Sequence, residues 1–409
     1  MSMLAESPAA VRPAQAIGAS EQAALRAQFP GCSEQVYLDT AGRNLIATPV
    51  RAAIDKYLDG RMLGGDKKKM FESVERARTG FAAIIGASPD EVAITKNISE
   101  GINIVAHAVD WREGDNAVIC GDVEHPNNIY PWIHAAQLYG TEVRNVSSRE
   151  GHIDAGVIGK AVDARTRVVS LSGTSFLPGF RVDLAEIQGV CEKVGAEFVV
   201  DGAQSMGVQT IDARALGLGA IAASTQKGLL GLYGMGFLYC RKDWAERMTP
   251  RYLARFGIDV GDRHEADLDD SENIVFRKGA LRFDLGNYNF IAAAALEPGL
   301  AILNAAGGVP AIDRYTRQLA VMLGDGLVDL DLPVIGWPAG PHIGSIVAVG
   351  SLKPDPVMEA RLVDLSEYLQ KENVKLSERR GCLRFSFHVY NNEDDVKELL
   401  RLIRIWRQR

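Results

Sequence analysis

Five predicted strands of the chain are each followed by a polar segment with the residue types that a catalytic site needs. These segments are residues 96–103, 124–128, 172–175, 201–204 and 224–228. In sheets of parallel strands, ligands bind just beyond the carboxyl ends of the strands. We therefore expect the polar side chains of the five segments to lie close together at one edge of a sheet.

The types of these side chains indicate a particular chemistry. A helix N-terminus at Ser99, together with Ser224, can bind a phosphate group through unpaired N–H donors and a hydroxyl. Asp201 can pair with a protonated pyridine nitrogen, and the ring of His125 can stack on the pyridine. Lys227 stands at the mouth of a buried strand, where a lysine with a lowered pKa can form a Schiff base. Taken alone, Ser99 is more often a plain helix cap and His125 more often a structural residue. Together they meet what pyridoxal phosphate requires of a protein, and the sequence predicts that cofactor.

The elements that must position these residues form an alternating pattern of strands and helices. Strands are predicted at residues 92–95, 117–120, 142–146, 167–171, 197–200, 220–224 and 236–240. Helical patterns cover residues 49–87 and 184–194. This alternation predicts an α/β domain with a mainly parallel sheet of seven strands.

After residue 286 the pattern changes to that of a smaller α+β domain. Helices are predicted at residues 289–304, 311–327, 355–372 and 393–407, with strands at 346–349 and 383–389. We therefore predict an N-terminal tail and arm over residues 1–35, a large cofactor-binding domain over 36–288 and a small C-terminal domain over 289–409.

Composition excludes several classes of function. The net charge of −7 and the pI near 5.6 disfavour nucleic acid as a partner. No apolar run is long enough for a membrane helix, and the first twenty residues lack the pattern of a secretion signal. The five cysteines are scattered without a C-x-x-C pair, which argues against disulfides and a zinc site. We expect a cytoplasmic enzyme without a metal or a membrane partner.

One motif points elsewhere and is rejected. Residues 217–222 match the G-x-G-x-x-A pattern of dinucleotide-binding loops. They follow a helical stretch and enter a strand, which is the reverse of the order that dinucleotide binding needs. A nicotinamide-dependent dehydrogenase is therefore not expected.

Several of these segments resemble the class V aminotransferase family. The segments are residues 37–42, 99–103, 124–125, 200–204 and 224–227, and the similarity extends from about Val36 to Trp406. The family comprises fold-type I pyridoxal-phosphate enzymes such as cysteine desulfurases, selenocysteine lyases, kynureninases and isopenicillin N epimerase. The resemblance implies that fold, a homodimer with shared active sites and a small amino acid as substrate.

The resemblance also assigns roles to individual residues. It implies cofactor contacts for Asn97, Ile98, Ser99, His125, Ser175, Asp201, Gln204, Ser224, Gln226, Lys227 and, reaching the partner subunit's phosphate, Asn287. The catalytic residues implied are Lys227, His125 and Asp201. Arg384 matches the arginine that binds the substrate α-carboxylate, and Asn128 is expected to contact the substrate. Arg43 departs from the small residue usual there, and we expect it either to meet a second anionic group of the substrate or to be a plain surface arginine.

A second departure concerns sulfur chemistry. Desulfurases of the family carry a nucleophilic cysteine on a mobile loop just before the arginine strand. Here the stretch from Glu378 to Arg384 is too short for that loop, and Cys382 would lie on the strand itself. We expect Cys382 to be a buried apolar residue.

The favoured function is a lyase similar to cysteine desulfurases and C–S lyases, without the loop cysteine. An aminotransferase or an amino acid epimerase is the alternative, because the same loss of an α-proton serves all three reactions. A third hypothesis, a scaffold without activity, is disfavoured by the joint presence of Lys227, Asp201 and Arg384.

Overall fold

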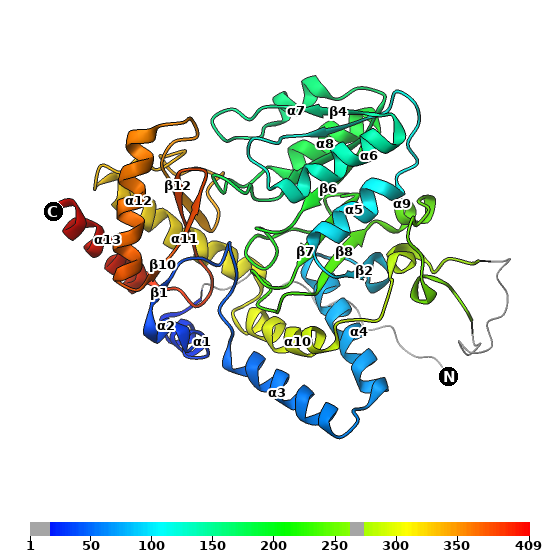
Figure 1. The fold of residues 1–409 in the computed structure, drawn as a ribbon, viewed down its shortest axis with the longest axis horizontal. Helices are drawn as coiled ribbons and strands as arrows, with labels where there is room; N and C mark the ends of the chain where they lie inside the picture. Colours follow the sequence, from blue (N-terminus) through cyan, green and yellow to red (C-terminus); the bar gives the residue numbers. More distant parts are fainter. Residues whose placement is uncertain (1–16, 262–273) are drawn as a thin grey trace.

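The computed structural model describes residues 17–261 and 274–409. Its centre is a seven-stranded sheet with the order β2-β8-β7-β6-β5-β3-β4 (Figure 1). The strands are β2 (Val92–Thr95), β3 (Asn116–Ile119), β4 (Glu142–Asn145), β5 (Thr166–Ser172), β6 (Glu197–Asp201), β7 (Ala220–Ser224) and β8 (Gly236–Cys240). β8 runs antiparallel to both of its neighbours, whereas every other adjacent pair is parallel. The predicted mainly parallel sheet is confirmed.

Helices cover both faces of this sheet, which explains why its central strands β5, β6 and β7 are buried along almost their whole length. Along β6, Phe198 and Val200 pack into one core cluster and Val199 into another, as expected for side chains that alternate between two faces. The first cluster includes α4 (Lys67–Ile84), α8 (Leu184–Val194) and α10 (Phe290–Ala305). The second includes α5 (Ile98–Ala108), α6 (Tyr130–Tyr139) and α9 (Lys242–Arg247). A further short helix, α7, spans Ala155–Ala161.

The helical pattern predicted over residues 49–87 is two helices in the structure. α3 spans Thr48–Met62, and α4 begins at Lys67. Between them Gly64 and Gly65 have φ angles of 98° and 74°, a left-handed backbone that ends a helix. Asp66 then caps α4 by accepting hydrogen bonds from the N–H groups of Lys68 and Lys69. The hydrophobic period continued across this break, so the sequence pattern missed it.

The C-terminal elements gather on the opposite side of the molecule from α5 and α9 (Figure 1). They are α11 (Val309–Val328), α12 (Pro356–Lys371), α13 (Glu393–Arg407) and a sheet of order β11-β12-β9. Its strands are β9 (Ile346–Val349), β11 (Ser377–Arg379) and β12 (Cys382–Ser386), all antiparallel. β1 (Val36–Tyr37) pairs in parallel with β10 (Val374–Lys375). The domain boundary at residues 288/289 stays a prediction; α10, which follows it, packs against α3 and α4.

The N-terminal segment is tied to the C-terminal part of the chain. α1 (Ala19–Arg26) is followed by α2 (Gly31–Glu34). The Gln22 side-chain amide donates to the backbone carbonyls of Val389 and Asn391, and Arg26 forms an ion pair with Asp395 at 2.8 Å. Residues 1–16 of the predicted tail lie outside the described residues.

Among the described helices, none is by itself long and apolar enough to cross a membrane. α10 and α11 meet the criteria of length and composition only when taken as one pair, bent by 72°.

Candidate active site

A cavity of about 300 Å³ opens at the carboxyl ends of β2, β6 and β7. It contains nine of the eleven predicted cofactor residues, namely Asn97, Ile98, Ser99, His125, Asp201, Gln204, Ser224, Gln226 and Lys227. Six further residues complete its wall: Gly42, Asn127, Ser172, Phe176, Ala203 and Tyr233. As expected, the polar segments that follow separate strands lie together at one edge of the sheet.

Lys227 lies in the turn that follows β7. The turn is fixed by backbone bonds from the Leu230 N–H to the Lys227 carbonyl and from the Asn44 N–H to the Gln226 carbonyl. Burial lowers the pKa of the Lys227 amine to about 8, and the charge of Asp201 only partly opposes that shift. Near neutral pH, a useful fraction of the amine is therefore unprotonated and nucleophilic.

Asp201 ends β6 with its carboxyl group buried. One oxygen, Oδ1, accepts a hydrogen bond of 2.8 Å from the Ala203 N–H. Burial raises the pKa of this carboxyl group, and the Ala203 bond and the Lys227 charge oppose that rise. A cation placed against the carboxylate would offset the cost of burying it. A protonated ring nitrogen is one such cation.

A second buried carboxyl group, that of Glu124, lies next to this site, although the sequence suggested no role for it. Its Oε1 accepts a 2.6 Å bond from the Ser172 N–H, and its Oε2 contacts the Ser172 hydroxyl and accepts from the Asn128 amide. Burial, followed by the charge of Asp201, raises the pKa of Glu124 to about 7. Ser172 also pairs with Asp201 between β5 and β6, so Glu124 holds the strand end beside that carboxylate. The available signal was an acidic residue directly before His125 in the segment that follows β3.

The opposite end of the cavity is built to bind an anion. α5 begins at Ile98, and the Asn97 side chain caps it by accepting from the Glu100 N–H. The N–H groups of Ile98 and Ser99 belong to the first turn of α5 and have no partner within the helix. The Ser224 hydroxyl is buried in the same cavity without a hydrogen-bond partner. A phosphate here would accept from all three donors and would face the positive end of the helix dipole.

His125 forms part of the cavity wall and packs against Phe176. Their ring centroids are 4.9 Å apart with the planes nearly perpendicular. The His125 Nδ1 accepts from the Asn127 N–H at 3.1 Å, which leaves the ring proton on Nε2. Burial and the charge of Lys227 lower the pKa of His125, so the ring is neutral at neutral pH. A neutral, fixed ring suits stacking.

Arg384 lies on β12 behind Phe176. Its Nη1 donates to the Phe176 carbonyl at 2.7 Å and its Nε donates to the Ser377 hydroxyl, but Nη2 has no partner. The side chain is 1% exposed, and burial lowers its pKa to about 10. Within residues 17–261 and 274–409 no carboxylate forms an ion pair with it. A buried cation with a free donor fits the predicted grip on a substrate carboxylate.

Besides Arg384, four predicted residues do not line the cavity. The Ser175 hydroxyl accepts from the N–H groups of Gly179 and Phe180, and it shapes the turn that presents Phe176. Asn128 is fully buried, and its amide is occupied by Glu124, Trp132 and Ser170. Its neighbour Asn127 is the residue at the cavity. Asn287 and Arg43 have exposed side chains, although Gly42 beside Arg43 lines the cavity.

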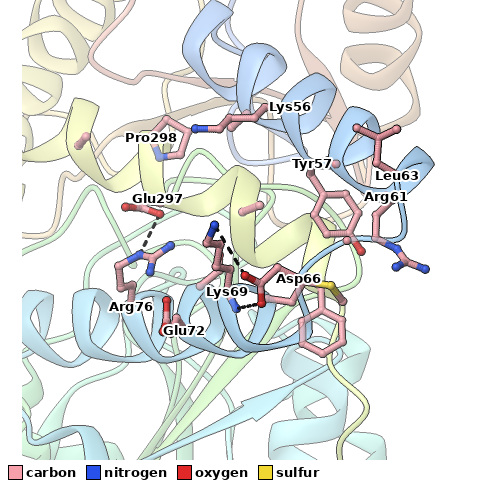
Figure 2. A pocket seen from close by; sticks show the side chains of 18 residues that line it. Lys56, Tyr57, Arg61, Leu63, Asp66, Lys69, Glu72, Arg76, Glu297 and Pro298 are labelled. Atoms are coloured by element: carbon pink, nitrogen blue, oxygen red, sulfur yellow. Dashed lines mark hydrogen bonds and ion pairs between the residues drawn. The ribbon is translucent and has the colours of Figure 1, made fainter.

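A larger cavity of about 910 Å³ lies between α3, α4 and α10 (Figure 2). Its charged side chains largely neutralise one another, as in the ion pairs Arg76–Glu297 and Lys69–Asp66. It contains none of the predicted site residues. Its walls come from helix surfaces rather than from strand ends, which makes it a poor candidate for the active site. Within the part of the chain that the structure describes, no group of three or more His, Cys, Asp or Glu side chains could hold a metal ion.

Comparison with known proteins places this site in a family. The model of the aminotransferase class-V family matches residues 36–399. The chain belongs to the class-V aminotransferase family. A probable cysteine desulfurase from Methanothermobacter thermautotrophicus is 30% identical over 92% of this chain and 95% of its own.

Solved structures of other proteins share the fold of this chain. A cysteine desulfurase from Thermococcus onnurineus has a TM-score of 0.81 at 24% identity, covering 94% of this chain and 97% of its own. A cystine C–S lyase, solved with its reaction product cysteine persulfide, has a TM-score of 0.81 at 23% identity, covering 92% and 99%. A mutant of that lyase, with glycine covalently linked to its pyridoxal-phosphate cofactor, has a TM-score of 0.82 at 23% identity, covering 92% and 98%. The predicted fold-type I architecture is thereby confirmed.

Proposed function

We propose that this class-V family member is a pyridoxal-phosphate-dependent lyase that cleaves the C–S bond of an amino acid derived from cysteine. The observation that carries the proposal is a buried amine, Lys227, in one cavity with a buried carboxylate and the buried Ser224 hydroxyl, which has no hydrogen-bond partner in the protein. The relatives named as cysteine desulfurase and cystine C–S lyase support the choice of a sulfur-bearing substrate.

The residues of the cavity fit pyridoxal phosphate. The unpartnered Ser224 hydroxyl and the first N–H groups of α5 match a phosphate, and Asp201 matches a protonated ring nitrogen. His125 would pack on the ring, and the Gln204 side chain would lie near its phenolic oxygen. When bound through its aldehyde to Lys227, this cofactor supplies a sink for the electron pair released at the substrate α-carbon.

The chain's own residues then do three things. Arg384 binds the substrate α-carboxylate and fixes which bond at the α-carbon faces Lys227. The Lys227 Nζ takes the α-proton, which its lowered pKa allows near neutral pH. The sulfur leaves the β-carbon with the bonding electrons and gains a proton. The remaining 2-aminoacrylate hydrolyses in water to pyruvate and ammonium, so one thiol and one pyruvate form per substrate.

A panel of amino acids tests this reaction. Purified holoenzyme should release pyruvate and a thiol in equal amounts from cysteine thioethers, and pyruvate and cysteine persulfide in equal amounts from cystine. Formation of a keto acid with transfer of the amino group would show an aminotransferase instead, and accumulation of the D-isomer would show an epimerase.

Cofactor uptake should depend on pH through Lys227. The rate of uptake by apoenzyme is expected to rise with pH and to level off above about 8, because only the neutral amine attacks an aldehyde. The growth of visible absorption after mixing measures this rate. A rate that keeps rising toward 10.5, the ordinary lysine value, would contradict the burial argued for Lys227.

Replacing Cys382 with serine should leave most activity. The Cys382 side chain is fully buried on β12, its Sγ contacts the Ser351 carbonyl at 3.3 Å, and burial raises its pKa. All five cysteines of the chain are buried, and none lines the cavity. We expect kcat within about threefold of wild type, since a core cysteine contributes packing and no chemistry. A loss of two orders of magnitude or more in a folded Cys382→Ser protein would restore a mechanism with a cysteine nucleophile.

We also propose that the enzyme is a cytoplasmic homodimer. Asn287 is exposed in the single chain, as expected if it reaches a partner subunit's phosphate, and the five unpaired thiols suit a reducing compartment. Light scattering of the purified protein measures the oligomeric state, and a monomer with full activity would contradict shared sites.

A further inference from the structure

A second arginine, Arg379, lies beside Arg384 above the cavity. Ser377 pairs with Arg384 between β11 and β12, and Arg379 is two residues further along β11. Because alternate residues of a strand share a face, and paired residues of neighbouring strands do too, both arginines lie on the same face of the hairpin. Both guanidinium groups lie over the ring of Phe176, Arg384 at 5.1 Å and Arg379 at 5.9 Å from its centroid. Phe176 in turn lines the cavity.

A tight turn holds Arg379 in this place. β11 and β12 are joined by two residues, Arg380 and Gly381, with φ angles of 50° and 75°. Positive φ at both central positions is typical of a type I′ turn, which has little freedom. The Arg380 guanidinium binds the backbone carbonyls of Asp122 and Glu124. The hairpin is thereby fastened to the segment that carries His125.

The charge at this end of the cavity is not balanced. Within the described residues, no carboxylate lies within ion-pair distance of Arg379 or Arg384. The Arg379 Nη1 donates only to the carbonyl of Glu378. The positive charges of Arg379 and Arg384 contribute to lowering the pKa values of His125 and Lys227. Two carboxylates act against this positive charge: Asp39 interacts with Arg384 and Lys227, and Asp201 interacts with Lys227.

One substrate carboxylate accounts for only one of the two arginines. Resting on the function proposed above, we propose that the substrate side chain carries a second anionic group of carboxylate type, and that Arg379 binds it. The planar fork of Arg379 suits a carboxylate, and its stacking on Phe176 keeps the fork beside the cavity. Neither arginine itself lines the cavity, but Arg379 is half-buried against Phe176 of the cavity wall, whereas Arg43, which the sequence suggested for such a role, is exposed.

Calorimetry with two simple anions tests this site without turnover. The holoenzyme is titrated with succinate, a dianion, and with propionate, its monoanionic counterpart. We expect wild type to bind succinate at least about tenfold more tightly, the equivalent of one charge-assisted hydrogen bond. Arg379→Ala should remove that difference and leave propionate unchanged, whereas Arg379→Lys should keep part of it. Arg401→Ala, on the exposed face of α13, is the matched control and should behave as wild type.

A pair of isosteric substrates separates this inference from the proposed reaction. S-Carboxymethyl-L-cysteine and S-carbamoylmethyl-L-cysteine differ only in the charge of the side-chain end. Wild type should show a kcat/KM about tenfold or more higher for the charged compound, and Arg379→Ala should lose this preference through KM. If neither compound is cleaved while succinate is still preferred, the proposed reaction is wrong and the anion site stands. If both are cleaved equally and both simple anions bind equally, the assignment of Arg379 is overturned.

Discussion

Replacing Lys227 with alanine is expected to abolish turnover, with kcat falling by at least about 10³-fold. The same amine is proposed to hold the cofactor aldehyde and to take the substrate α-proton, so one substitution removes both actions. No other lysine lines the cavity. The measurement is pyruvate release from a cysteine thioether under saturating substrate. Some cofactor should still bind without a covalent bond, because the phosphate donors at Ser224 and α5 remain.

The fold of this variant should be intact. Burying the lysine amine costs free energy, as its lowered pKa indicates, so its loss should not lower the melting temperature. Lys397→Ala, at an exposed position on α13, is the control for loss of a lysine elsewhere. Turnover of Lys227→Ala comparable to that of wild type would remove the assignment of this residue.

Replacing Asp201 with asparagine should leave the cofactor attached but lower kcat by roughly 10²- to 10³-fold, the usual cost of removing one preorganised electrostatic partner. An amide has nearly the same shape as the carboxylate, so the Ala203 N–H keeps its acceptor. It carries no charge, however, and cannot hold a proton on the ring nitrogen. The electron sink at the substrate α-carbon is weakened while binding is not.

Two readouts separate this electrostatic role from a structural one. The visible absorption of the bound cofactor should persist in Asp201→Asn, and KM should change much less than kcat. The pKa of Glu124 should also fall from about 7, because the charge of Asp201 contributes to raising it. Unchanged kcat in this variant would show that Asp201 does not face the ring nitrogen.

Much of the fold follows from local pattern. All seven predicted strands are the strands of the central sheet, because most of them are short apolar runs bounded by turn residues. The edge strand β4, with three polar residues out of four, is the exception. The helix Glu393–Arg407 is also found as predicted, since Asn392 caps it and its apolar face is strongly periodic. The helix break at Gly64 and Gly65 was not predicted, because the spacing of hydrophobic residues does not show where one helix ends and the next begins.

The site was predictable where it depends on strand ends, and less so where it depends on side-chain direction. Lys227, Asp201 and Ser224 stand directly at such ends, and they meet in one cavity. Asn127 rather than Asn128 lines that cavity, because the single 3₁₀ turn Pro126–Asn128 decides which amide points inward.

Contacts between distant segments set the rest of the site. The Phe176 carbonyl accepts from Arg384, more than two hundred residues away, and Arg379 reaches the same ring from the β11–β12 hairpin. The local sequence around Phe176 or Arg379 does not predict these long-range contacts. Glu124 was likewise missed because its partner Ser172 lies on another strand.

The most direct test of the account identifies the residue that holds the cofactor. Holoenzyme is treated with borohydride, which fixes the cofactor on the amine that carries it, and the digested protein is examined by mass spectrometry. The account predicts a single modified peptide with the added mass on Lys227. Modification of a different lysine, or a fully active enzyme with no modified lysine at all, would contradict it.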